Sequence, residues 1–83
     1  MTTPEQLQGY IQNGMQCDHV AVTGDGAHFE AVIVSPLFRD KSRVQRHQVV
    51  YKALGDRMRE EIHALSMQTH TPEDWARQQA APA

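Results

Sequence analysis

Apolar and polar residues recur along this chain with two spacings, one typical of helices and one typical of strands. Near the N-terminus, Leu7, Tyr10 and Ile11 follow the helical spacing of three and four residues. Residues 3–6 read TPEQ, which supplies a hydroxyl cap, a proline at the first helical position and a glutamine that completes a capping box. We therefore predict a first helix that begins at this box and ends near Gly14.

The next apolar segments follow the strand period. Residues 17–23 alternate, the Gly-Asp-Gly sequence at 24–26 supplies the positive φ angles of a hairpin turn, and residues 28–35 form the return strand. The return strand is apolar on both faces, a pattern that predicts an interior strand.

A second capping box, Ser42 with Gln45, opens a longer helix that we expect to reach about Ile62. Gly55 lies inside this helix and costs up to about 1 kcal/mol relative to alanine, so a bend is expected there. The inner stripe of the helix is predicted to consist of Val44, His47, Tyr51, Leu54, Met58 and Ile62.

Two further elements complete an αββαβα order. Residues 63–70 predict a third strand, and the sequence TPED at 71–74 caps a final helix that is expected to bury Trp75. This order predicts an α+β domain with helices packed over a three-stranded sheet. The single domain should cover residues 1–80, with 81–83 as a flexible tail.

Composition narrows the class of protein. With 83 residues, 40% of them hydrophobic and 22% charged, the chain is an ordinary small globular domain. No apolar run approaches the ~20 residues of a membrane span, and the N-terminus lacks the form of a signal peptide. Cys17 is the only cysteine, so an internal disulfide and a zinc site with paired thiolates are excluded. A soluble, cytoplasmic protein without membrane contact is expected.

Basic residues gather between positions 39 and 59, although the net charge is −2. Those near the start of the long helix could bind nucleic-acid phosphates, the carboxylates of glutathione or the acidic face of a partner protein. They are Arg39, Lys41, Arg43 and Arg46. A solvated helix face is the simpler interpretation for most of them, since the GxxG clamp of nucleic-acid-binding KH domains and interleaved aromatic residues are both absent from the sequence.

Enzyme motifs are missing as well. The sequence contains no Ser-His-Asp spacing, glycine-rich phosphate loop or paired-acid pattern, and so small a domain leaves little room for a deep pocket. We predict that the protein is not an enzyme.

Four sequence blocks resemble the BolA family, and in particular its bacterial IbaG-type branch. They are GDGAHFEAVIVSPLF at 24–38, SRVQRHQVVY at 42–51, IHALS at 62–66 and TPEDWA at 71–76. The resemblance implies an αββαβα fold with a three-stranded mixed sheet, related to class II KH domains. It also implies a heterodimer with a CGFS-type monothiol glutaredoxin, a shared [2Fe-2S] cluster, and a role in iron-sulfur cluster trafficking and iron homeostasis. Some members of the family are described as DNA-binding transcription regulators, which makes DNA the alternative partner.

The resemblance places the family's cluster-ligand histidine at His63. Neutral imidazole is a good iron ligand, and a cysteine of the glutaredoxin and the cysteine of glutathione would complete the site. The isolated protein, a monomer or weak homodimer, is therefore expected to carry no cofactor. The alternative is that His63 only caps the preceding helix or packs at the start of the strand.

A second ligand position in the family falls in the hairpin loop, where the resemblance aligns Asp25. Many members carry cysteine or histidine there, and carboxylate is a harder ligand that suits iron-sulfur clusters less well. His28 could replace it, or could be an ordinary strand residue. Nothing brings Cys17 to this site, and His47 fits a buried histidine bonded to backbone better than a ligand. Two further histidines have no motif support: His19 and His70.

Overall fold

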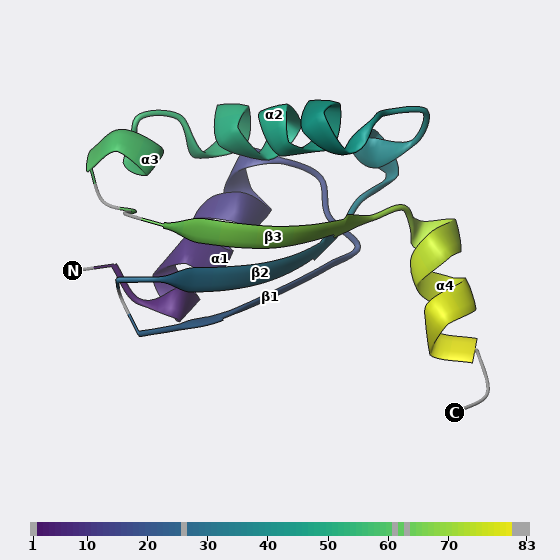
Figure 1. Ribbon diagram of the computed structural model, residues 1–83, viewed down its shortest axis with the longest axis horizontal. Coiled ribbons are helices and arrows are strands. Elements are labelled where there is room, and N and C mark those ends of the chain that lie inside the picture. The colour runs from purple at the N-terminus through teal and green to yellow at the C-terminus, as the bar shows by residue number, and fades with distance from the viewer. Residues whose placement is uncertain (1, 26, 61, 63, 81–83) are drawn as a thin grey trace.

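The computed structural model describes residues 2–25, 27–60, 62 and 64–80. The predicted order is confirmed, with three strands and helices packed against them (Figure 1). The elements are α1 (Pro4–Gly14), β1 (His19–Gly24), β2 (Phe29–Val34), the 3-10 turn η1 (Pro36–Phe38), α2 (Arg43–Leu54), the single-turn α3 (Arg57–Glu60), β3 (Leu65–His70) and α4 (Pro72–Ala80).

Both predicted capping boxes start their helices. The Thr3 hydroxyl accepts from the Gln6 backbone N–H at 3.1 Å, and the Gln6 side chain accepts from the Thr3 N–H at 2.9 Å. Ser42 and Gln45 form the same reciprocal pair, at 3.2 and 2.9 Å. Each box satisfies two of the N–H groups that a helix start leaves without intrahelical partners.

The sheet is mixed, with strand order β1-β2-β3. β2 pairs antiparallel with β1 and parallel with β3, so β2 is the interior strand, as its two-sided apolarity predicted. The parallel pairing requires a long crossover connection, and α2 and α3 supply it.

The core lies between the sheet and the helices α1 and α2. α1 packs against β1 and α2, and α2 packs against β3. Side chains that alternate along the strands face these helices, since successive strand residues point to opposite faces. The buried cluster comprises Leu7, Ile11, Val20, Phe29, Ala31, Ile33, Phe38, Val50, Leu54 and Ile62.

The second long helix differs from its prediction. α2 ends at Leu54, and Gly55 is its C-cap rather than a residue inside the helix, with φ 60° and an N–H that donates to the Tyr51 carbonyl. Because this positive φ is reached readily by glycine and rarely by other residues, the helix stops there and the short α3 follows.

The predicted inner stripe of this helix is also wrong in part. Val44 is 66% exposed and Tyr51 is 40% exposed, whereas Val50 and Leu54 are fully buried. The apolar residues of this helix occur on more than one face, so their spacing did not identify the buried side.

Two other predictions need adjustment. The Trp75 ring is half-buried rather than buried, because α4 packs beyond the end of β3 and not over the centre of the sheet (Figure 1). The third strand begins at Leu65 among the described residues. Its predicted start at His63, and the predicted tail at 81–83, lie outside them. Within the described part of the chain, no helix has the length and apolar character needed to cross a membrane.

Candidate functional site

The hairpin between β1 and β2 is closed by the Asp25 carboxylate. Its Oδ1 accepts from the backbone N–H groups of Ala27 and His28, both at 3.0 Å, and its own N–H donates to the His28 carbonyl at 3.2 Å. These N–H groups, that of His28 first, lower the pKa of Asp25. Gly24 has φ 151°, and a Cβ there would lie 2.4 Å from the His28 carbonyl oxygen. The Asp25 carboxylate therefore stabilises this turn through its two backbone hydrogen bonds.

The start of β3 lies beside this hairpin. The Phe29 N–H donates to the Ala64 carbonyl at 2.9 Å, and Nε2 of the exposed His28 ring lies 3.4 Å from the Ser66 hydroxyl. Ile62, on the other side of position 63, is only 4% exposed and belongs to the core. The two segments that carry the candidate cluster ligands thus meet at one end of the sheet.

His63 itself lies outside the described residues, so its assignment as a cluster ligand stays a prediction. Its chain neighbours are described, and the Ala64 carbonyl is fixed by β2. Ser66 was not predicted as a site residue. Its register partner is Glu30, and strand alternation places His28 on the same face of the sheet as Glu30, so the pairing of β2 with β3 would have revealed the contact.

The donor atoms at this edge differ in how well they suit an iron-sulfur cluster. His28 offers an exposed imidazole, a borderline ligand that suits iron. Asp25 offers a hard carboxylate, one oxygen of which already holds the turn. Among the described residues, no group of three or more His, Cys, Asp or Glu side chains is placed to hold a metal ion.

Cys17 lies at the other end of β1. About seven residues of extended chain separate it from the hairpin, which corresponds to ~23 Å. Its thiol is half-buried and lies 3.6 Å from the Met15 carbonyl, and burial, followed by the charge of Asp18, raises its pKa. A raised pKa disfavours the thiolate that binds metals.

Two histidines flank the tryptophan of α4 at that same far end. The His19 ring stacks on Trp75 with centroids 5.4 Å apart, and the His70 ring is tilted against it at 5.3 Å. The Nδ1 atom of His70 lies 3.4 Å from the Gln78 amide nitrogen. Both histidines therefore position α4, remote from the hairpin.

His47 contacts a different aromatic residue. Its half-buried ring meets Tyr51 edge-on at 6.4 Å. The hydrogen bond to backbone that we predicted for it is not among the contacts of the described residues.

Two of the four basic residues that were predicted to bind a partner or nucleic acid form hydrogen bonds within the protein. Arg39 holds the Glu73 carboxylate of α4 through Nε and Nη2, at 2.5 and 3.0 Å. The Arg46 guanidinium donates to the carbonyls of Lys41 and Thr69, at 3.1 and 3.2 Å, and lies over the Phe38 ring. These contacts connect the loop before α2 to β3 and α4.

The remaining two have separate surroundings. Lys41 borders a hollow beside α1, whereas Arg43 borders a hollow on the β3 side of α2 together with His47 and His70. Lys41 and Arg43, both exposed, thus border different hollows.

Comparison with known proteins identifies the family. The family model described as "BolA-like protein" matches residues 3–74. The chain belongs to the BolA family. It is 38% identical over 73 residues to the acid stress protein IbaG of Escherichia coli, covering 87% of each chain. It is 42% identical over 60 residues to the DNA-binding transcriptional regulator BolA of Haemophilus influenzae, covering 72% of this chain and 58% of the relative.

A solved structure agrees with this assignment. The BolA homologue of Coxiella burnetii is similar with a TM-score of 0.86 at 41% identity, over 93% of this chain and all of the other. The α+β fold of the described residues is thus a BolA fold.

Proposed function

We propose that this BolA-family protein is an adaptor that partners a CGFS-type monothiol glutaredoxin and shares a [2Fe-2S] cluster with it. In this role it would act in the trafficking or assembly of iron-sulfur clusters and in iron homeostasis. The family membership supports an adaptor or regulator rather than an enzyme.

One observation carries the proposal. The hydrogen bond from the Phe29 N–H to the Ala64 carbonyl holds the hairpin against the segment that contains His63. A ligand from the hairpin and a ligand from the start of β3 can then belong to the same site. The exposed His28 ring is the hairpin side chain whose chemistry fits iron.

Within such a complex, the residues of this chain have separable tasks. His63 would supply one imidazole ligand and His28 is the candidate for a second, while Asp25 keeps the loop in shape. When bound, the cluster would supply one-electron redox chemistry. Imidazole ligands in place of thiolates would raise its reduction potential.

Reconstitution with glutaredoxin, iron, sulfide and glutathione tests the proposal through visible absorption and circular dichroism. We expect His63→Ala to alter the spectrum and to shorten the lifetime of the heterodimeric cluster by about tenfold or more. His28→Ala should have a smaller effect in the same direction. His47→Ala is the control, because this histidine lies on α2. If the cluster of His63→Ala matches that of the wild type in spectrum and lifetime, the assignment fails.

DNA binding is the second candidate, favoured by the name of the Haemophilus influenzae relative. The exposed Arg43 in the first turn of α2 is the cation best placed for it, since Arg39 and Arg46 are engaged elsewhere. Arg43→Ala together with Lys41→Ala should weaken DNA binding. The slope of log affinity against log salt concentration should also become shallower by about two, because two phosphate contacts are lost. Gel shifts at several salt concentrations measure this, and an unchanged slope would remove the candidate.

A further inference from the structure

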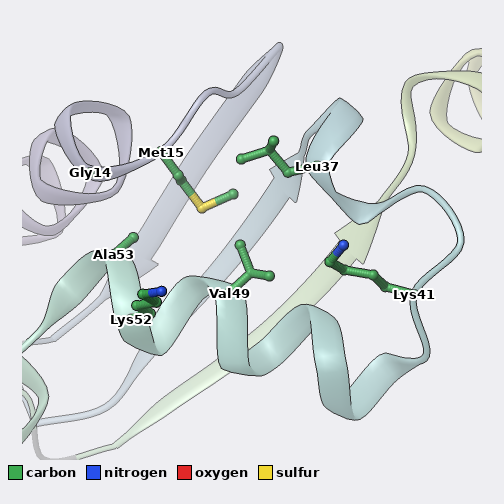
Figure 2. A pocket seen from close by; sticks show the side chains of 7 residues that line it. All are labelled: Gly14, Met15, Leu37, Lys41, Val49, Lys52 and Ala53. Carbon is green, nitrogen blue, oxygen red and sulfur yellow. The ribbon is translucent and has the colours of Figure 1, made fainter.

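A groove opens on the helical side of the molecule, away from the hairpin. It has a volume of about 450 Å³ and lies where the end of α1, the segment after β2 and the exposed flank of α2 meet (Figure 2). Sites that hold small molecules or single anchoring side chains commonly have volumes of several hundred cubic ångströms. Size alone therefore allows the groove to accept one large side chain.

The lining of the groove is apolar at its centre. Met15 projects from the end of α1 toward Val49 of α2, and Leu37 faces them across the opening (Figure 2). Leu37 is 40% exposed, although the neighbouring Phe38 is fully buried. The apolar surface of Leu37, opposite Met15 and Val49, thus stays partly exposed in the folded protein and can contact an apolar side chain of a partner.

Two ammonium groups border this apolar centre. Lys41 lies on one side and Lys52, in the last turn of α2, lies on the other (Figure 2). In the part of the chain that the structure describes, the side-chain ion pairs join Arg39 to Glu73 and Arg77 to Asp74, and neither uses these lysines. Both lysines are exposed, so their charges are available to an incoming partner.

A second hollow continues the groove along α2. It has a volume of about 350 Å³ and shares Lys41, Val49 and Lys52 with the first. Asp40 also borders this second hollow, so carboxylates of an occupant are expected beside Lys52 rather than beside Asp40.

The end of α1 and the last turn of α2 approach closely at the floor of the groove. A Cβ built on Gly14 would lie 2.6 Å from the Ala53 carbonyl oxygen, so backbone meets backbone at this point. Because the hollow is already formed in the free protein, little conformational entropy is lost in ordering its side chains when a partner binds.

We propose that this groove binds an acidic segment of another protein that inserts one large apolar side chain. The apolar centre takes the side chain, and the flanking lysines select for carboxylates near it. This inference does not rest on the shared cluster. The hairpin lies at the other side of the molecule from the segment after β2 (Figure 1), and the test uses the protein without glutaredoxin.

The test is an NMR titration of the isotope-labelled protein with synthetic peptides. Each peptide carries a central phenylalanine or leucine between glycine-serine spacers, with paired glutamates at both ends. We expect saturable shifts of the backbone amides of Met15, Leu37, Val49 and Ala53. Matched peptides with central glycine, or with lysine in place of glutamate, should leave these amides unchanged.

Variants assign the two parts of the groove. Lys52→Glu should weaken the acidic peptide by about fivefold or more, whereas Arg43→Glu on the other side of α2 should change its affinity by less than about twofold. Leu37→Ala should weaken it by a similar factor, with the exposed Val44→Ala as its control. All four residues are exposed, so the fold should survive these changes.

Several outcomes would overturn the proposal. These are the absence of amide shifts with every peptide, equal binding of lysine and glutamate peptides, and shifts confined to another face. Sedimentation showing a homodimer built on these residues would identify a second copy as the occupant instead. Saturable binding of decanoate, without binding of the peptides, would assign the groove to a small amphiphile.

Discussion

The hairpin carboxylate illustrates how one side chain can explain a departure from a family pattern. Asp25 stands where the resemblance to BolA proteins leads one to expect cysteine or histidine. In the structure its Oδ1 accepts two backbone N–H groups. Its presence is therefore accounted for by the turn, whether or not a metal binds nearby.

Asp25→Ala should destabilise the protein at neutral pH by removing the acceptor for these N–H groups. The folded pKa of Asp25 lies below its ordinary value of 3.8, so its stabilising effect is complete above that pH and is lost as the pH falls through the folded pKa. Urea unfolding at pH 7 and at progressively lower pH measures the difference between wild type and variant. We expect this difference to shrink as Asp25 becomes protonated.

Asp25→Asn is the matched control for that experiment. The amide keeps the accepting oxygen and loses the charge, so asparagine should destabilise the protein less than alanine does at pH 7. The stability of the asparagine variant should lack the pH dependence that the ionisation of Asp25 contributes. An alanine variant as stable as the wild type at pH 7 would show that the turn does not depend on this side chain.

Residue roles at the charged surface were the least predictable from sequence. Arg39 and Arg46 looked equivalent to Lys41 and Arg43 in a basic run. The structure separates them, because Arg39 reaches Glu73 and Arg46 reaches the Thr69 carbonyl. These partners are more than 20 positions away in the chain, and local patterns contain no information about them.

Among the elements, helix starts were predictable and one helix end was not. Thr3 and Ser42 carry their caps in the sequence itself, and both boxes form. Gly55 was placed inside a helix because Met58 and Ile62 continue the helical spacing beyond it. A glycine inside a helix and a glycine at its C-cap differ in backbone angles, which the apolar pattern does not reveal.

The contact between α1 and α2 depends on the missing side chain of Gly14. Gly14→Ala should lower the free energy of unfolding by about 1–3 kcal/mol, because the new methyl group would collide with the Ala53 carbonyl of α2. Chemical denaturation measures this loss.

Gly9→Ala is a control in the same helix, since a Cβ there has no heavy atom within 4 Å. It should leave stability unchanged or raise it by up to about 1 kcal/mol through helix propensity. Equal effects of the two substitutions would show that the close approach of α1 and α2 is not what Gly14 provides.

At the scale of the whole molecule, the fold class was predictable and the meeting of distant segments was not. Two-sided apolarity identified β2 as the interior strand. The contact of the hairpin with the start of β3 depends on the parallel register of Phe29 with Leu65, which pairs segments on either side of the crossover through α2. Sequence reasoning could place His28 near a candidate site only through the family resemblance.

The small core implies that single large side chains carry much of the total stability. A domain of this size is expected to be stable by about 4–12 kcal/mol. Phe38→Ala removes a fully buried ring and should cost about 3–5 kcal/mol. Thermal and urea unfolding should show a large loss in the free energy of unfolding, so that part of the variant population is unfolded even without denaturant.

Val44→Ala is the matched control for core position. Val44 belongs to the stripe that the sequence predicted to be buried, yet it is 66% exposed. Its removal should change stability by no more than about 0.5 kcal/mol. A loss comparable to that of Phe38→Ala would mean that Val44 is buried after all.

The packing of α4 also makes the protein its own optical reporter. Trp75 is the only tryptophan in the sequence, and its indole rests between the rings of His19 and His70. Indole emission depends on neighbouring aromatic rings and on solvent. Detachment of α4 from the sheet would therefore change the colour and intensity of the fluorescence. Movement of this one helix can be followed in the unmodified chain, without a dye and without interference from a second tryptophan.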